Sequence, residues 1–306
     1  MRVEVSDGDY LDWRIFLVTY ALVDDWYNQK GQYLLHRTVG VKPVFSDSEM
    51  LTLMLAIDFF EFTSERRYHA FIAANYLALF PQLLDQSQYN RRARSLRYLL
   101  NELRKDWASE LGVQWENHFL LDTTPVIVVG YRRDKSQSYF RGSADYGYCA
   151  ARQLKYFGYK LVMLTPLDDT PYSFELVPAH TDERDAADEI LDTLPWGCHV
   201  WSDKGFIGED WQTAWQAQGI FVWTAKRDNQ KEQNPAVFDQ LLNQVRERIE
   251  GAYDILKEGG RSVEKTLAIT VEDLASRIIA QISSVTLRLF LRKFFGIDVL
   301  TYTVNP

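Results

Sequence analysis

Three acidic residues lie where their carboxylates can do chemistry. Asp122 interrupts an otherwise apolar run at 118–129, Asp203 directly follows a short β-rich run, and Glu250 lies within a long helical pattern. A carboxylate in a buried strand is costly unless a cation or metal ion compensates its charge. Mg²⁺ prefers such oxygen ligands, and two ions about 3.5–4 Å apart support phosphodiester chemistry. Together the three residues predict a divalent-metal site that acts on phosphodiesters.

Each of these residues also has a purely structural interpretation. Asp122 can end its strand and cap a turn with Thr123–Pro125, and Asp203 can initiate a β-turn ahead of Gly205. Glu250 can belong to a solvated helix stripe, paired with Arg246 one turn away. Taken singly, the three positions leave both interpretations open.

The elements that must position these residues are of two kinds. Residues 10–115 read as helices, with periodic segments at 10–30, 64–80 and 87–111. Ser46 and Glu49 form a capping-box pattern ahead of an apolar run at 50–60, which indicates a helix start. We therefore expect an all-helical N-terminal domain at 1–115.

From about residue 117 onward, strands alternate with helices. Strands are expected at 118–129, 159–166, 172–178, 198–203 and 220–225, the second and third forming a hairpin. Helices are expected at 182–193, 209–218, 235–258 and 270–295. This alternation predicts an α/β domain at 116–306.

The composition is that of a globular protein, with 306 residues of which 46% are hydrophobic and 25% charged. No run approaches the ~20 apolar residues of a membrane-spanning helix, so we expect no membrane partner. The 2 cysteines lack metal-ligand spacing, and a reducing cytoplasm is the expected compartment.

The formal net charge of −8 at first argues against a nucleic-acid partner. The charge is unevenly distributed, however: residues 161–225 hold 12 acidic and 2 basic residues, whereas 86–105 hold 6 basic and 1 acidic. Residues 131–160 hold 7 basic and 2 acidic residues. Most acids of 161–225 are expected in the hairpin turn and the helix at 182–193, solvated and away from DNA. The pattern permits a polyanionic partner, although solvated helix faces would give the same basic runs.

The expected helix at 87–111 carries the first basic run. Arg91, Arg94 and Arg97, then Arg104 or Lys105, fall near one face at steps of three and four. We expect this face to recognise DNA as the second helix of a helix-turn-helix.

Aromatic residues interleave with the second basic run. Tyr146, Tyr148, Tyr156 and Phe157 either stack on an unpaired base or belong to the core, and the core is favoured for most of them.

Several motifs in a shared order resemble DDE transposases of bacterial insertion sequences, in particular the family numbered 982, over nearly the whole chain. They are FSDSEMLTLML (45–55), LDTTPV (121–126), RGSADYGYCAARQLKYFGYKL (141–161), ELVPAH (175–180), SDKGFIG (202–208), AKRDN (225–229) and VRERIEGAYDILK (245–257).

The resemblance implies a ribonuclease H-like catalytic domain, with a mixed five-stranded sheet flanked by helices, behind a helical DNA-binding domain. It makes Asp122, Asp203 and Glu250 the catalytic residues and the ligands of two Mg²⁺ or Mn²⁺ ions. The implied activity is cleavage at transposon ends and strand transfer into target DNA. The residues implied or suggested to contact DNA are Arg246, Lys257, Lys204, Arg227, Asn229, Arg91, Arg94 and Arg97.

The implied partners are double-stranded DNA, namely the terminal inverted repeats and the target, and a second copy of the chain on DNA. The implied location is the bacterial cytoplasm, with nucleoid association during activity.

Three positions depart from the family pattern. Asn243 replaces the Tyr of a Tyr, Arg, Glu, Lys signature, Phe206 replaces the Tyr after Asp-Lys-Gly, and His180 replaces an Asn. Two rival functions stay open: a host nuclease that cuts without strand transfer, and a catalytically idle DNA-binding descendant.

Overall fold

The fold is taken from a computed structural model. It describes residues 12–35, 43–60, 62–133, 135–136, 138–226, 235, 237–238, 240, 242, 244–245, 256, 262–263 and 266–298. The chain forms two compact units, which are described separately. The first comprises Met1–Leu111, Glu258–Ser262 and Thr270–Pro306, and the second comprises Gly112–Lys257 and Val263–Ile269. We call them the helical unit and the sheet unit.

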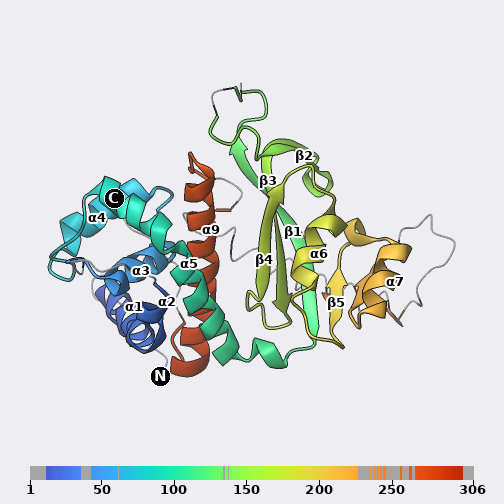
Figure 1. The fold of residues 1–306 in the computed structure, drawn as a ribbon, viewed down its shortest axis with the longest axis horizontal. Helices are drawn as coiled ribbons and strands as arrows, with labels where there is room; N and C mark the ends of the chain where they lie inside the picture. Colours follow the sequence, from blue (N-terminus) through green and yellow to red (C-terminus); the bar gives the residue numbers. More distant parts are fainter. Residues whose placement is uncertain are drawn as a thin grey trace. The chain divides into compact units, whose positions relative to one another are not determined.

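The helical unit contains the helices expected in residues 10–115, together with the short helix α2 and the last helix of the chain (Figure 1). They are α1 (Asp12–Trp26), α2 (Gln32–Leu34), α3 (Asp47–Ala56), α4 (Glu65–Asn75), α5 (Gln86–Leu111) and α9 (Val271–Phe295). The capping box is confirmed, because the Ser46 hydroxyl accepts from the Glu49 amide and the Glu49 carboxylate accepts from the Ser46 amide. The apolar run that follows is buried almost throughout α3, which lies at the centre of this unit.

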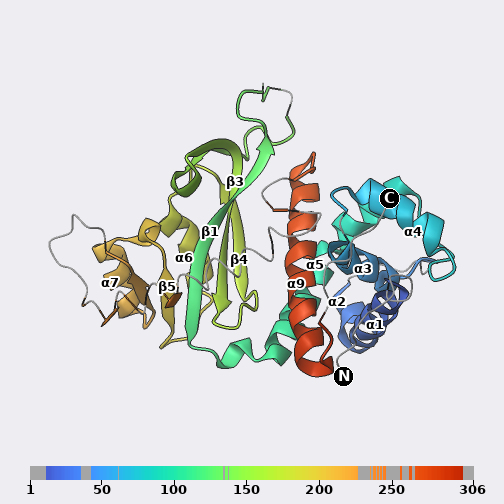
Figure 2. The same ribbon diagram turned by 180° about the vertical axis from the view of Figure 1, so that it is seen from behind.

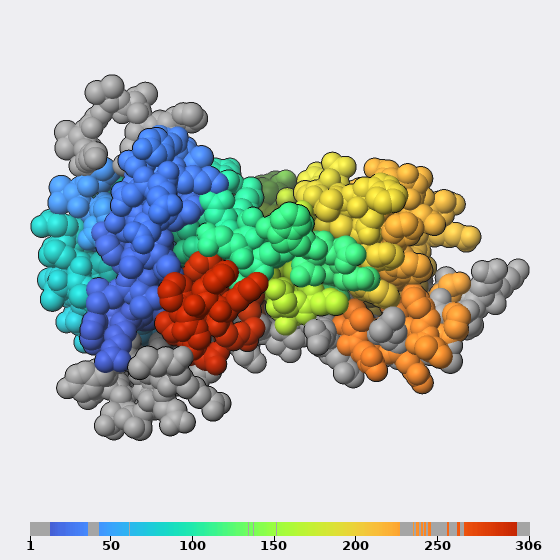
Figure 3. Space-filling model, turned by 90° about the horizontal axis from the view of Figure 1, so that it is seen from below, coloured from blue at the N-terminus to red at the C-terminus, as the bar shows by residue number. Residues whose placement is uncertain are grey.

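The last helix differs from expectation in its partners. We expected residues 270–306 to belong to the α/β domain, but α9 packs against α3 and α5 in the helical unit. The Ser284 hydroxyl on α9 reaches the Leu55 carbonyl (2.8 Å) and the Asp58 carboxylate (3.0 Å) near the end of α3. Figure 3 shows the end of α9, in red, against α5, in teal. Apolar residues on more than one side of α9 predict that this helix is buried. They do not predict which of the two units it packs in.

The same helix corrects the expectation that no run is long and apolar enough for a membrane span. In the part of the chain that the structure describes, Val271–Phe295 is one helix long and apolar enough to cross a membrane. Of its most apolar window, 78% is buried inside the structure, as in the core helix of a globular unit. Packing against α3 and α5 accounts for its apolar character.

The sheet unit is built on one mixed sheet. Its strands are β1 (His118–Val129), β2 (Asp145–Cys149), β3 (Leu154–Pro166), β4 (Ser173–Pro178), β5 (His199–Ser202) and β6 (Phe221–Thr224). β1 pairs antiparallel with β3 and parallel with β5, which pairs parallel with β6. β4 pairs antiparallel with β3, so three antiparallel strands continue into two parallel ones. This is the ribonuclease H-like order that the resemblance implies.

The sheet has one more strand than expected. Among the described residues it has six strands, because β2 also pairs with β3, beyond the end of β4. β2 pairs with residues 154–158 and β4 with 159–164, so the two share one edge of β3. Figure 2 shows how the connection between β1 and β2 extends past this end of the sheet.

The two faces of the sheet have separate cores. One face packs Phe119, Leu121 and Val200 against α6 (Glu183–Leu191) and α7 (Glu209–Ala217). The other places Leu120 and Trp201 against Leu242, with Phe238 and Val245 nearby. Most of the helix expected at 235–258 lies outside the described residues, but these three side chains assign its amino-terminal half to the second face.

Candidate active site

Asp122, within β1, and Asp203, the residue that follows β5, lie level with each other. The last register pair between β1 and β5 is Leu121 with Ser202, and the next residue on each side is an aspartate. Parallel neighbours in a sheet are about 4.8 Å apart. Both aspartates continue the alternation of the buried pair Leu120 and Trp201, so their side chains belong to the same face. The structure therefore brings these two candidate ligands together.

The structural interpretation of each aspartate was that it forms a turn, and this holds for only one of the two. β1 runs on to Val129 and pairs with β3 on both sides of Asp122, so this aspartate does not end its strand. Asp203 does initiate a turn, because its carboxylate accepts from the Lys204 amide at 2.6 Å. The Asp122 carboxylate likewise accepts from the amide that follows it, Thr123, at 2.7 Å. Each carboxylate is thus held by its own backbone and is half-buried.

The face that bears the two aspartates is covered by the segment leading to Glu250. Leu242 and Val245 pack on the Leu120 and Trp201 side of the sheet. Glu250 itself lies outside the described residues, as do Arg246, Lys257, Arg227, Asn229 and Asn243. Within the described ranges, no cluster of three or more His, Cys, Asp or Glu side chains is arranged to hold a metal ion. The third predicted carboxylate therefore stays a prediction.

A further carboxylate, Glu183, lies beside the two aspartate-bearing segments. It is in the first turn of α6, and its carboxylate accepts from the Thr123 hydroxyl at 3.2 Å. It also lies so close to Gly205 that a Cβ there would overlap its Oε2 atom. We had expected the acids of this helix to be solvated and remote. An Asp-Glu pair at the start of a helix is typical of helix capping. Capping alone accounts for the pair, so the sequence pattern does not indicate the contacts of Glu183 with Thr123 and Gly205.

Lys204 follows Asp203 in a short 3₁₀ turn, Lys204–Phe206, and is half-buried. Phe206 is 1% exposed and packs in the core with Leu191 and Val200, so the position at which the resemblance implies a tyrosine is buried. His180, the other departure in this unit, contacts the Asp145 carboxylate at 3.2 Å on the surface.

The basic residues of α5 divide into exposed and buried ones. Arg91 is exposed, and Arg94 and Arg97 are half-buried. The Arg97 guanidinium lies 4.6 Å from the Tyr98 ring centre, and Tyr98 is itself 68% exposed. Arg104 is only 2% exposed, so it does not belong to the DNA-facing set that its spacing indicated. Burial lowers the pKa of Arg104 to about 10.

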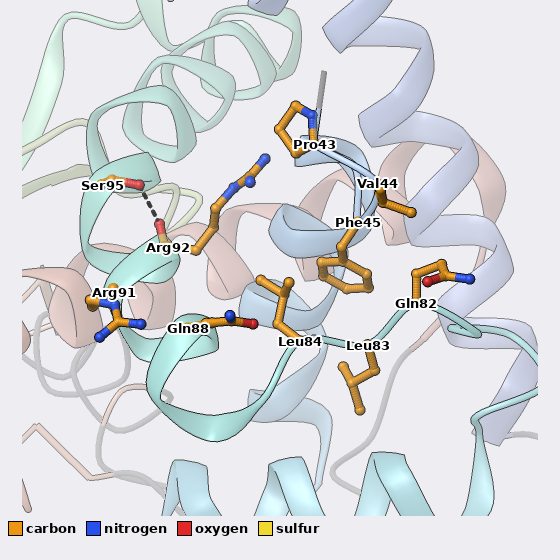
Figure 4. Close-up of a pocket in the computed structure, with 10 residues that line it drawn as sticks. All are labelled: Pro43, Val44, Phe45, Gln82, Leu83, Leu84, Gln88, Arg91, Arg92 and Ser95. Carbon is orange, nitrogen blue, oxygen red and sulfur yellow. Dashed lines mark hydrogen bonds between the residues drawn. The ribbon is translucent and has the colours of Figure 1, made fainter. Parts of the chain in front are cut away.

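α5 is also not the second helix of a simple helix-turn-helix. The connection from α4 spans 76–85, longer than the three or four residues of that motif. Beside the start of α5 is a hollow of about 710 Å³. Figure 4 shows side chains of α5 on one side of it and residues 43–45 on the other. The α5 side chains that line it are Gln88, Arg91, Arg92 and Ser95.

The aromatic residues of the second basic run are split between core and surface. Tyr156 and Phe157 are buried at 2% and 5% exposure, as favoured from the sequence. Tyr146 and Tyr148 are 50% and 55% exposed. The alternation in β2 explains the difference, because its even-numbered side chains face solvent while Gly147 lies against Tyr156.

The strand order and the level aspartates define the sheet unit as a ribonuclease H-like domain. Comparison with known families matches residues 116–286 to the transposase DDE domain, over more than half of the chain. The protein therefore belongs to the transposase DDE family, whose members generally use divalent metal ions.

No curated protein matches the chain. One solved structure that it resembles is the piggyBac transposase synaptic complex with hairpin DNA, determined by cryo-EM. The two chains are 10% identical, with a TM-score of 0.45, over 95% of this chain and 77% of the other.

Proposed function

We propose that this protein is an insertion-sequence transposase that cuts DNA at the transposon ends and transfers the strand into target DNA. The observation that carries the proposal is the level placement of Asp122 and Asp203 on one sheet face, within a chain of the transposase DDE family. Glu250 is the proposed third acidic residue. The insertion-sequence family numbered 982 is the proposed subgroup.

The two aspartates suit a pair of divalent cations. Both are hard oxygen donors at neighbouring strand positions, and each is held by a backbone amide. With Glu250 they would hold two Mg²⁺ or Mn²⁺ ions. Bound there, the ions would supply positive charge at the attacking and leaving oxygens of a phosphodiester.

The side chains orient the DNA around this pair. Lys204, next to Asp203, is suited to contact a phosphate beside the one that is cut. Arg246 and Lys257 lie one and two helical turns from Glu250 in the sequence and are proposed phosphate contacts, with Arg227 and Asn229 as further DNA contacts. Water attacks the phosphodiester at the transposon end and displaces a 3′-hydroxyl. That 3′-hydroxyl then attacks a phosphodiester of the target DNA and displaces the target strand's own 3′-oxygen.

The helical unit is the proposed reader of the terminal repeats. Arg91, Arg94 and Arg97 lie on α5, and Arg91 also lines the hollow beside it. Arginine contacts both phosphates and guanine edges, so this surface can combine positioning with sequence recognition. Joining two ends requires two active sites, and a homodimer on DNA in the cytoplasm is proposed.

The test is cleavage and strand transfer on DNA carrying the terminal repeats that flank the gene, with Mg²⁺. Asp203→Asn is compared with the unaltered protein, and Asp210→Asn, an exposed acid on α7, is the matched control. We expect Asp203→Asn to lose at least about 100-fold in rate and Asp210→Asn to keep its rate. Equal cleavage by all three proteins would refute the assignment. Cleavage without joining would indicate the nuclease, and no cleavage with retained binding would indicate the idle descendant.

A further inference from the structure

Two exposed tyrosines of β2 lie on the same sheet face as Asp122. Asp122 pairs with Met163 of β3, and the alternation along β3 puts Phe157 and Lys155 on that face. Tyr146 pairs with Phe157, and Tyr148 pairs with Lys155. Residues paired across a sheet share a face, so Tyr146 and Tyr148 share the face of the proposed active site.

The tyrosines lie within reach of DNA bound at the aspartates. Met163 is six residue steps along β3 from Phe157, or about 20 Å. That length corresponds to about six base-pair steps of B-form DNA at 3.4 Å each. A DNA end held at Asp122 therefore extends as far as β2 within a short length.

The surface around these tyrosines is aromatic and open. Tyr146 and Tyr148 are 50% and 55% exposed, and Tyr131, which meets the Tyr146 ring edge-on at 5.6 Å, is 43% exposed. Phe157 is buried beneath, with its ring centre 5.0 Å from that of Tyr146. We call Tyr131, Tyr146 and Tyr148 the tyrosine strip. Its rings expose apolar faces to water. A partner with planar groups can cover these faces by stacking on them.

The charge around the tyrosine strip is positive. The Lys135 ammonium lies 5.0 Å from the Tyr146 ring centre and 5.6 Å from that of Tyr131. Lys155 is exposed beside Tyr148, and Arg132, Arg133, Arg141 and Arg152 are exposed on the neighbouring segments. Of the 2 acidic residues among 131–160, Asp145 contacts His180. Flat rings flanked by cations match unpaired nucleotides, whose bases stack while their phosphates meet the charges.

We propose that the tyrosine strip binds unpaired nucleotides of DNA, which stack on Tyr146 and Tyr148 while Lys155 meets the backbone. This rests on the proposed function, because it places the nucleotides on the face that carries Asp122. The bases in a duplex are already stacked on one another and offer their faces only at ends and interruptions. The strip should therefore prefer single-stranded tails or opened ends over blunt duplex.

The experiment measures binding of the full-length protein in EDTA to fluorescent oligonucleotides, either an oligo-dT strand or a blunt duplex of unrelated sequence. The Tyr146→Ala/Tyr148→Ala double variant is compared with Tyr146→Phe/Tyr148→Phe, which keeps the rings. Tyr33→Ala is the matched control, since Tyr33 is 73% exposed on α2 of the helical unit. Circular dichroism and melting temperature establish that each variant is folded.

We expect the double alanine variant to bind oligo-dT at least tenfold more weakly and duplex unchanged, with the phenylalanine variant near the unaltered protein. 2-Aminopurine in the strand should be quenched by stacking in the unaltered protein and not in the alanine variant. Lys155→Ala should lower the salt slope of oligo-dT binding by about one charge. If the double alanine variant loses affinity equally for oligo-dT and for duplex, the tyrosine strip contacts duplex DNA. If its binding to both is unchanged, the tyrosine strip does not bind DNA. Either outcome overturns the proposal.

These measurements use no metal and no cleavage. A failure of the tyrosine strip to bind strands is therefore distinguishable from a failure of Asp203→Asn to lose cleavage.

Discussion

Leu121 faces Ser202 across the parallel pair of β1 and β5, so the residue after each is an aspartate at the same level. Both aspartates belong to the same face of the sheet, where two hard oxygen donors at one level suit a divalent cation.

This placement predicts an effect on stability that does not depend on activity. The melting temperatures of Asp122→Asn, Asp203→Asn and the unaltered protein in EDTA, where no divalent ion is bound, give the baseline. Adding Mg²⁺ should raise the melting temperature of the unaltered protein through binding to the folded state, and raise it little in the variants. Asp210→Asn is the control. A Mg²⁺ shift of the same size in all four proteins would locate the binding elsewhere.

Glu183 couples Thr123 to Gly205, and a double-mutant cycle should detect this coupling. In Gly205→Ala the new methyl group displaces the Glu183 carboxylate, which then loses its bond from the Thr123 hydroxyl. With Glu183→Ala already present, the three atoms nearest to the new methyl group are gone, because all three belong to the Glu183 carboxylate. The unfolding free energies should depart from additivity by about 1 kcal/mol, measured by urea denaturation. Additive changes would mean that the carboxylate can relax away at no cost.

Asp188 on α6 accepts from two indole groups, Trp211 Nε1 at 2.7 Å and Trp215 Nε1 at 2.9 Å. Asp188→Ala leaves both donors without this acceptor while they pack against the core, and should cost about 2–3 kcal/mol in the free energy of unfolding. Glu189→Ala, the next residue and exposed, should change it by less than about 0.5 kcal/mol. Equal losses of unfolding free energy in the two variants would mean that the substitutions act through helix propensity and not through the two indole hydrogen bonds.

Gly158 leaves no room for a side chain. A Cβ there would overlap the Val126 carbonyl oxygen of β1, next to the register shift at Ile127 and Val129. Gly158→Ala should therefore destabilise the sheet unit by about 3 kcal/mol, because backbone has to move. Gly130→Ala, with the nearest atom 4.0 Å from the new Cβ, should be neutral or slightly stabilising. Urea midpoints measure both, and equal midpoints for the two variants would contradict this packing.

His199 makes stability depend on pH. Its Nδ1 accepts from Trp223 Nε1 at 2.9 Å, and burial together with neighbouring His118 lowers the pKa of His199 below its ordinary value of 6.5. The unfolded chain therefore binds the proton more readily, so this contribution to stability is present above pH 6.5 and is lost as pH falls below it. His199→Gln should lose less stability between pH 7.5 and 5.5 than the unaltered protein, measured by urea denaturation. A steeper loss in the variant would reverse the sign assigned to His199.

Much of the fold follows from local pattern. The Ser46 capping box, the apolar run of β1 and the β3–β4 hairpin each carry a signal within a few residues, and all three are confirmed. β2 was missed because Tyr146 and Tyr148 alternate with small and polar residues only over one short edge strand.

The part of the candidate site that depends on the strands alone was predictable from the sequence. The separation of Asp122 and Asp203 in sequence equals the register offset of β1 and β5, so correct strands bring the two together. Glu183 was not predictable, because its contacts with Thr123 and Gly205 depend on where α6 is placed over the sheet. The burial of Arg104 likewise depends on which helix covers that side of α5.

The packing of α9 in the helical unit has a consequence for synthesis. Leu274, Ile278 and Ile282 complete a core whose other helices precede the entire sheet unit in the chain. Since domains fold as their residues leave the ribosome, the sheet unit can close while the helical unit still lacks its last helix. The nascent chain thus acquires its proposed cutting fold before its proposed DNA-reading fold, and a message truncated ahead of α9 yields a chain whose helical unit is unfinished.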